Sequence, residues 1–165
     1  MITIDYARRM AAYNAWMNEK LYSAAASLDD AARKQDRGAF FKSIHGTLNH
    51  LIYGDLAWLA RFRGESTEGV LPDAEFFADF AVLRARRSSL DAELSAFVET
   101  LTPEWLVADF TYYSAAYGQR YTRPAWLLVT HVFNHQTHHR GQLTTLLSQC
   151  GLDVGATDLP VMPDL

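Results

Sequence analysis

Residues 124–151, PAWLLVTHVFNHQTHHRGQLTTLLSQCG, have the features of one long helix with both of its ends. Pro124 suits the first helical turn, where a backbone N–H is not needed, and Gly151 suits the residue that follows a helix. We therefore predict a helix that continues through Trp126 to about Gln149. The fold and the function of the chain both depend on which residues this helix turns toward its neighbours.

Histidines recur along one face of this predicted helix. His131, His135 and His139 follow one another at intervals of four, while His138 and Gln142 lie three residues after His135 and His139. Residues four apart are separated by about 6 Å of helical rise, so two such imidazoles can bind one metal ion. Three in a row span roughly 12 Å, too far for all three to share an ion. At least one ligand must come from another part of the chain.

The only other histidines lie in a second predicted helix, residues 40–62. On a helical wheel His50 shares its face with small residues, namely Ser43, Gly46, Thr47, Gly54 and Ala57. These leave room for an imidazole and for close approach of a facing helix. His45 lies nearer the bulky face, and for His45 and His138 a polar position at a helix contact, or a group that supports a ligand, is the favoured interpretation.

The rest of the chain predicts an all-α fold, a four-helix bundle. Two further stretches, residues 5–28 and 73–101, have apolar residues at helical spacing, with Asp73 as the expected N-cap of the second. Pro103 is expected to stop that helix. Helices of this length with short connections favour a bundle, in which ligand sites lie between facing helices.

The connections are expected to be irregular or short. Residues 29–38 should end the first helix, and residues 64–72 are rich in turn residues. Residues 104–123 favour extended structure around Gly118, as a long loop or a small hairpin. Residues 152–165 are expected to form an extended tail. With no repeat and no linker, residues 1–165 are predicted to be one domain.

Composition excludes several classes of protein. The 165 residues carry 15 Lys and Arg against 19 Asp and Glu, a net charge of −4, which is the wrong sign for a nucleic-acid or anionic-membrane partner. No run approaches the 18 to 20 apolar residues, roughly, that cross a bilayer, and no export signal is recognisable. We expect a soluble, cytoplasmic protein whose partner is neither a nucleic acid nor a membrane. A single cysteine, Cys150, excludes an internal disulfide.

Two familiar metal sites do not match the histidine pattern. The segment from His135 to His139 has the histidine spacing of a zinc metalloprotease, but Gln136 stands where that mechanism needs a glutamate base. A ferritin-like di-iron centre needs Glu-x-x-His pairs, which this sequence lacks.

Other polar and aromatic residues have two interpretations each. Asp55 is expected either to orient a ligand or a buried basic group, or to pair with one of Arg84, Arg86 or Arg87. Arg140 points away from the histidine stripe and is expected to be structural. Four tyrosines of the irregular segment are expected to cover the site as a lid, or to serve in packing and surface contacts: Tyr112, Tyr113, Tyr117 and Tyr121.

Three segments together resemble one known family. They are YNAW at residues 13–16, SIHGTLNH at residues 43–50 followed by Asp55 and Trp58, and HVFNHQTHHRGQ at residues 131–142. The chain closely resembles the DinB-like family of damage-inducible bacterial proteins over nearly its whole length.

The resemblance implies a four-helix bundle, commonly a homodimer, that holds one divalent metal ion, usually nickel or zinc. Carried over residue by residue, the metal ligands are His50, His135 and His139. Three neutral ligands leave positions open for water or substrate, as in a catalytic site. Related proteins are thiol-dependent S-transferases and isomerases, so the expected function is metal activation of a low-molecular-weight thiol, or of water, against a small electrophile. The alternative is a non-enzymatic metal-binding protein of the stress response.

Overall fold

Four long helices form the framework of the chain in a computed structural model that describes residues 1–67, 76–115 and 117–163. They are α1 (Ile4–Ala26), α3 (Ile44–Phe62), α4 (Phe80–Glu99) and α6 (Ala125–Gln149). The shorter elements are the helices α2 (Asp30–Lys34) and α5 (Pro103–Val107), the strands β1 (Asp109–Ser114) and β2 (Gln119–Pro124), and a 3-10 turn, η1 (Leu159–Val161).

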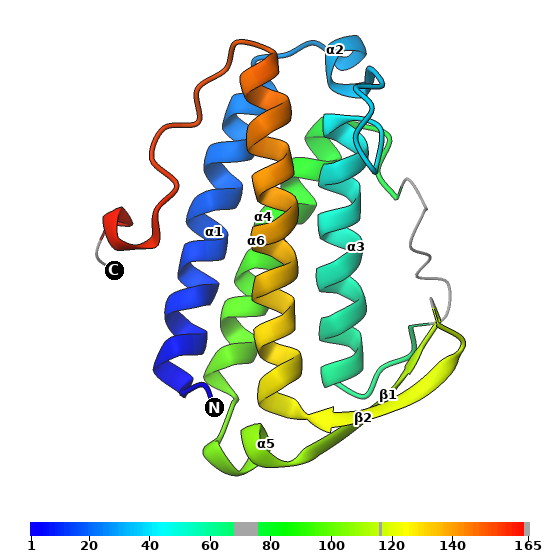
Figure 1. Ribbon diagram of the computed structural model, residues 1–165, viewed down its shortest axis with the longest axis vertical. Helices are drawn as coiled ribbons and strands as arrows, with labels where there is room; N and C mark the ends of the chain where they lie inside the picture. The colour runs from blue at the N-terminus through cyan, green and yellow to red at the C-terminus, as the bar shows by residue number, and fades with distance from the viewer. Residues whose placement is uncertain (68–75, 116, 164–165) are drawn as a thin grey trace.

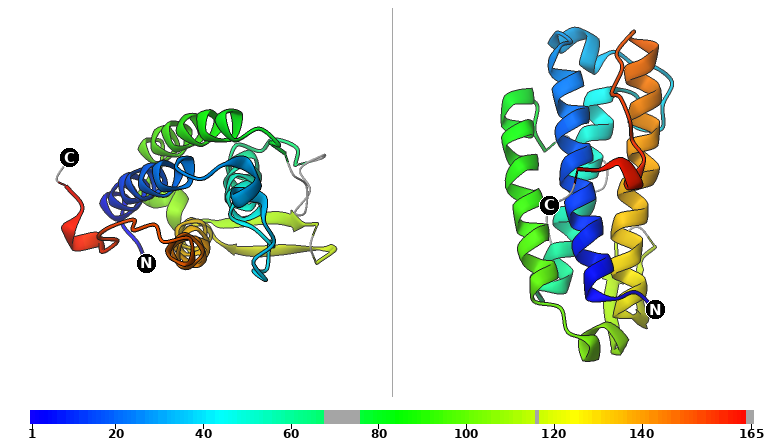
Figure 2. Two further views of the ribbon diagram at one scale, coloured as in Figure 1. Left: turned by 90° about the horizontal axis from the view of Figure 1, so that it is seen from above. Right: turned by 90° about the vertical axis from the view of Figure 1, so that its left-hand side faces the viewer.

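The long helices pack as a bundle in which α1 and α3 each contact both α4 and α6 (Figures 1 and 2). In Figure 1, α1 and α6 run upward while α3 and α4 run downward, so two of the four neighbouring pairs are parallel. The predicted four-helix bundle is confirmed. The helix directions differ from those of a simple up-down-up-down bundle, because α3 ends at the lower end of the bundle in Figure 1 and α4 begins at the upper end.

The segment before α6 is a hairpin, the second of the two structures expected there. The strands β1 and β2 pair antiparallel from Asp109 opposite Pro124 to Ser114 opposite Gln119. A backbone hydrogen bond of 2.9 Å from Ala125 N to Ala108 O joins the first residue of α6 to the chain just before β1. The hairpin therefore leaves the base of α6 and extends sideways below α3 (Figure 1).

Two helices begin later than the sequence predicted. The start at residue 40 was wrong, because Ser43 caps α3 through a 2.9 Å hydrogen bond from Gly46 N to its hydroxyl. The start at residue 73 was also wrong, since Asp79 caps α4; Asp73 itself lies outside the described residues. Phe77 is not helical because its backbone N–H and C=O bond to side chains of α3 instead.

Two short helices were not predicted. Asp29 caps α2 where the sequence indicated only the end of the first helix. Pro103 does end the preceding pattern, but it also begins α5, with the Thr102 hydroxyl accepting a hydrogen bond from Trp105 N. Both follow from local capping chemistry at a point where the apolar periodicity carries no information.

The core lies along the bundle axis and receives apolar side chains from all four long helices. Its fully buried members include Leu21 and Tyr22 of α1, Ile44 and Leu48 of α3, Leu83 and Leu90 of α4, and Leu143 and Leu147 of α6. Among the described residues, no helix combines the length and apolar character that a bilayer span requires.

A charged cluster lies inside this apolar core. The Arg87 guanidinium of α4 is within 2.8 Å of a carboxylate oxygen of Asp55 of α3 and 2.9 Å of Asp91 one turn along its own helix. Asp55 and Arg87 are only 1% and 2% exposed. Burial disfavours the charged guanidinium, but the two carboxylates outweigh that cost and raise the pKa of Arg87. Of the three arginines expected for Asp55, Arg87 is its partner.

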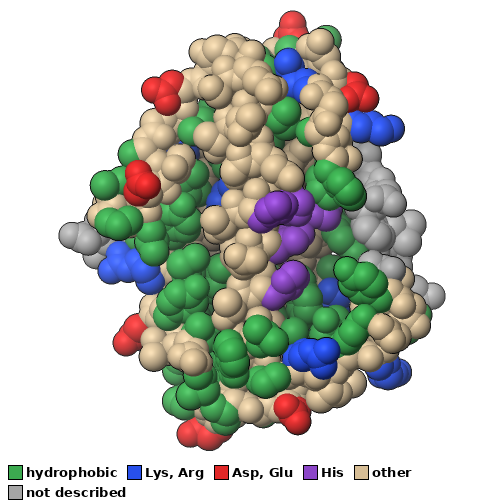
Figure 3. All heavy atoms as spheres, in the orientation of Figure 1, with side chains coloured by type: hydrophobic (Ala, Val, Ile, Leu, Met, Phe, Trp, Pro, Cys, Tyr) green, Lys and Arg blue, Asp and Glu red, His purple; other side chains and the backbone are tan. Residues whose placement is uncertain are grey.

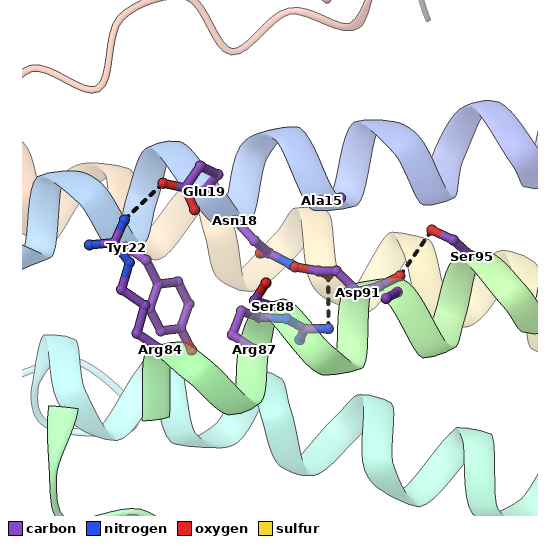
Figure 4. A pocket seen from close by; sticks show the side chains of 10 residues that line it. Ala15, Asn18, Glu19, Tyr22, Arg84, Arg87, Ser88, Asp91 and Ser95 are labelled. Atoms are coloured by element: carbon purple, nitrogen blue, oxygen red, sulfur yellow. Dashed lines mark hydrogen bonds and ion pairs between the residues drawn. The ribbon is translucent and has the colours of Figure 1, made fainter. Parts of the chain in front are cut away.

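Amides extend the cluster to the other two helices. From α1, Asn14 and Asn18 each donate a hydrogen bond to Asp91, and Asn18, Arg87 and Asp91 face one another in Figure 4. From α6, Gln136 donates to Asp55 at 2.7 Å and to the backbone C=O of Leu51 at 3.0 Å. All four helices are thereby joined through one buried polar network.

Replacing Arg87 by methionine removes the cation from between two acidic groups. We expect Arg87→Met to lower the free energy of unfolding by about 3–5 kcal/mol, because buried carboxylates are left uncompensated. The matched control is Arg84→Met in the same helix, whose exposed pair with Glu19 is worth less than about 1 kcal/mol. Urea unfolding measures both variants. Equal losses would show that the buried pair contributes no more than a surface one.

Candidate metal centre

Three histidines from two helices converge on one point. His50 of α3 and His135 and His139 of α6 each offer a ring nitrogen, and these three atoms all lie within 4.8 Å of one another. The Nε2 atoms of His50 and His135 are 3.0 Å apart. Two nitrogens that bind one tetrahedral zinc ion are separated by about 3.3 Å. In the described part of the chain no other group of His, Cys, Asp or Glu side chains meets in this way.

Gly54 explains how His135 approaches α3 so closely. A Cβ atom built on Gly54 would lie 2.9 Å from Cε1 of His135, which is closer than real side chains come. Gly54 lies one turn after His50 on the same helix face, so the glycine creates the space into which the imidazole of α6 fits. The row of small residues around His50 predicted this open volume from the sequence.

A tight loop before α3 places an aromatic ring on His50. Gly46 permits this loop, because a Cβ at Gly46 would collide with the carbonyl oxygen of Phe41. Lys42 adopts a left-handed conformation with a φ of 64°, and the turn closes with a 2.8 Å bond from Lys42 N to Ala39 O. As a result the ring of Phe41 stacks on His50 with centroids 3.7 Å apart.

Hydrogen bonding and burial prepare two of the imidazoles for metal binding. His139 donates from Nδ1 to the side-chain oxygen of Gln142 at 2.8 Å, which leaves Nε2 unprotonated and free to act as a ligand. Burial, with smaller contributions from His139 and His50, lowers the pKa of His135 to about 3. His135 is therefore neutral at pH 7 and gives up no proton on binding a cation. The donor set fits a divalent ion.

The other histidines do not join this group. His131 lies one turn before His135, with ring centroids 5.8 Å apart, and is oriented toward Trp58. His138 packs edge-on against His139, and His45 is buried with its Nε2 2.8 Å from the carbonyl oxygen of Phe77. His45 is thus a polar group at a contact between segments, one of the two interpretations given for it, while the role of His138 stays a prediction. The structure brings together the three histidines named from the sequence, while their role as ligands stays a prediction.

Two further expectations concern residues beside the histidines. Arg140 is buried and turned toward α1, where its guanidinium donates to Asn14, so the expected direction away from the stripe is confirmed. Asp55 contacts Gln136, the residue next to His135, and holds no histidine itself. Asp55 is thus part of the ionic network behind the site.

The histidines form part of the wall of a pocket of about 580 Å³. Its wall is mainly aromatic, with contributions from α3, α6, the hairpin and the loop before α3. The residues that line it besides the three histidines are Phe40, Phe41, Tyr53, Gly54, Ala57, Trp58, Arg61, Tyr112, Ser114, Tyr117, His131, His138 and Gln142. Figure 3 shows the histidine side chains gathered beside hydrophobic ones on the face that carries α6.

Some lining residues agree with the sequence predictions and some were missed. Tyr112 and Tyr117 line the pocket, while Tyr113 and Tyr121 do not; that the hairpin acts as a lid stays a prediction. Phe41 was predicted only as a core residue of a helix, and Arg61 received no role. For Phe41 the available signal was Ser43, a typical N-cap residue followed three residues later by Gly46, which would place Phe41 in the loop before the helix.

Comparison with known proteins tests the resemblance directly. The model of the DinB family matches residues 1–165. The chain belongs to the DinB family. Protein DinB of Bacillus subtilis (strain 168) is 27% identical over 158 residues, which cover 93% of this chain and 91% of that protein. The family resemblance stated from the sequence is confirmed.

Solved structures of similar proteins share the fold. YfiT from Bacillus subtilis, described as a probable metal-dependent hydrolase with an unusual four-helix bundle topology, matches with a TM-score of 0.67 and 19% identity, covering 93% of this chain and 92% of YfiT. A DinB-like protein from Bacillus cereus matches with a TM-score of 0.58 and 20% identity over 85% of this chain and 89% of that one. At these identities the likeness establishes the bundle alone.

Replacing Gly54 by alanine tests the close approach of the two helices. We expect Gly54→Ala to weaken metal binding at least about tenfold, because the new methyl group displaces His135 from the other two histidines. The matched control is Gly141→Ala in α6, where a Cβ meets nothing within 4 Å and affinity should not change. Competition with a chelator measures both. Unchanged affinity in Gly54→Ala would contradict the described arrangement.

Proposed function

We propose that this DinB-family protein is a metal-dependent enzyme. One divalent ion, nickel or zinc, is held by His50, His135 and His139 and activates a low-molecular-weight thiol, or water, against a small electrophile. The observation that carries the proposal is the convergence of three imidazoles within 4.8 Å in the wall of an open pocket. Three protein ligands leave a coordination position for the reactant, which is typical of catalytic rather than structural sites.

The protein's own residues have identifiable tasks in this proposal. A divalent ion supplies the Lewis acidity that lowers the pKa of a thiol or a water molecule at its open position. Gln142 fixes the ring of His139 through Nδ1, and Phe41 holds the ring of His50 by stacking. The aromatic wall places an apolar surface beside the reacting groups, and electrostatic interactions are stronger next to such a surface than in bulk water.

One observation favours water as the nucleophile, and another favours a thiol. The description of YfiT as a probable metal-dependent hydrolase favours water. The resemblance to thiol-dependent members of the superfamily favours a thiol. Cys150 cannot supply it, since this cysteine lies at the end of α6, donates its S–H to the carbonyl oxygen of Leu146 and is absent from the pocket wall. A thiol would have to be a second substrate.

A non-enzymatic metal-binding protein is the alternative. Such a site would be expected to be closed by a fourth protein ligand, because structural zinc sites are almost always completed by the protein. The pocket beside the three histidines has room for a small molecule instead, which supports the enzymatic proposal.

Metal content provides the first test. Protein purified without a histidine tag should carry close to one equivalent of a divalent metal per chain, and His135→Ala should lose it. The matched control is His138→Ala, which removes a neighbouring imidazole that does not join the three. Elemental analysis after dialysis measures both. Less than a tenth of an equivalent in the unaltered protein would end the proposal.

Turnover provides the second test. Metal-loaded protein is assayed with bacillithiol, mycothiol and glutathione against a generic electrophile, and with activated esters for hydrolysis. We expect one nucleophile to react at least about a hundredfold faster than with His135→Ala, since removal of a metal ligand removes the activated nucleophile. Equal rates for the two proteins with every nucleophile would favour the non-enzymatic alternative.

A further inference from the structure

The positively charged side chain of Arg61 lines the same pocket as the histidines and is not one of the three proposed metal ligands. Arg61 near the end of α3 lines the pocket, with its guanidinium carbon 4.8 Å from the ring centroid of Trp58 and 5.5 Å from that of Tyr112. These two rings meet edge to face, 5.0 Å apart. The side chain is therefore held against an aromatic surface that spans α3 and the hairpin.

Arg61 differs from other arginines near it in having no acidic partner. Within the described residues, Arg63 and Arg86 pair with Glu93, and Arg87 pairs with Asp55 and Asp91, but no carboxylate lies within 4.0 Å of Arg61. Its Nε atom is buried with no hydrogen-bond partner. A half-buried guanidinium without a counter-charge carries a desolvation cost that a bound anion would remove.

The distance between Arg61 and the histidines sets the length of a molecule that could contact both. Arg61 follows His50 by eleven residues, close to three full turns, so both lie on one face of α3. The helical rise between them is about 16 Å, and the long side chain of Arg61 extends back to Trp58, so the guanidinium lies closer to the histidines than its own Cα does. The gap between the two groups is on the order of 10 Å.

We propose that Arg61 is the anion-binding residue of the pocket and that the substrate carries an oxyanion group, a carboxylate or a phosphate, at the end remote from its reacting atom. The inference deepens the proposed function, and rests on it for the statement that the reacting atom lies at the histidines. The planar guanidinium offers two parallel N–H donors to such a group, and Trp58 and Tyr112 hold it in place. Apolar parts of the substrate would lie along the aromatic wall.

Other groups of the pocket agree with an anionic rather than a cationic substrate. The lining contains imidazoles, hydroxyls, an amide and one guanidinium, and no aspartate or glutamate among its described residues. Trp58 contacts both Arg61 and His131, whose ring centroid lies 5.3 Å from its own, and the ring of His131 lies 5.8 Å from that of His135. A short row of rings therefore connects the guanidinium to the histidines.

The test uses phenylbutyrate and phenylbutanol, which differ only in the carboxylate. Calorimetry with metal-free protein should show phenylbutyrate binding about tenfold more tightly, because a charge-assisted hydrogen bond is added. Arg61→Gln should bind both probes equally. The control Arg63→Gln alters an arginine of the same helix end that is paired with Glu93, and should keep the tenfold preference. Equal binding of the two probes by the unaltered protein, or a preference that survives in Arg61→Gln, would overturn the proposal.

A second measurement needs no substitution, in case Arg61→Gln does not fold. Addition of phenylbutyrate to the unaltered protein should shift the ¹H–¹⁵N signal of the Arg61 Nε–H, and phenylbutanol should leave it in place. Absence of a shift at saturating phenylbutyrate would again overturn the proposal.

A metal-loaded arm separates this inference from the proposed function. Mercaptohexanoate can reach both sites at once, while mercaptohexanol can reach only the histidines. If thiols bind no better with metal than without it, the thiol form of the proposed function fails, and the metal-free probes still decide the role of Arg61. If thiols gain affinity from the metal but mercaptohexanoate gains nothing from Arg61, the anion site fails and the metal site stands.

Discussion

The fold depends on one buried guanidinium. Arg87 in α4 neutralises Asp55 of α3 and Asp91 of its own helix, and through their carboxylates it is connected to amides of α1 and α6. A charge in an apolar interior is stable only where its partners are correctly placed, so this network tolerates few arrangements of the four helices. Apolar packing brings the helices together, and the network restricts their rotation and their register along the bundle.

That restriction reaches the histidines through a single residue. Gln136 donates to Asp55 and to the backbone of α3, and its neighbour in sequence, His135, occupies the space that Gly54 leaves open. The buried side of α6 thus fixes the register in which its pocket side meets His50. His135 in the pocket wall and Gln136 in the core are successive residues, so a shift of Gln136 away from Asp55 would also displace the imidazole of His135.

The sequence predicted those features that depend on local spacing. The histidine stripe of α6, the small-residue face around His50 and the ends of α6 all follow from helical periodicity and from proline and glycine, and each agrees with the structure. The features it missed depend on contacts between segments far apart. Hydrogen bonds to Asn49 keep Phe77 out of α4. Which of the three arginines pairs with Asp55 is decided by how α3 and α4 pack against each other. Arg61 gave no signal, because a lone arginine near a helix end has the same pattern whether it meets solvent or a pocket.

The separation of His50 and His135 along the chain has a consequence for how the protein matures. His135 follows His50 by 85 residues, and bringing the ends of a disordered segment of that length together costs entropy, so folding of the intervening helices favours their contact. A nascent chain that has not yet formed α6 has only one of the three imidazoles in place. In the proposed function, binding of the ion would therefore be a late event of folding that follows the docking of the last long helix.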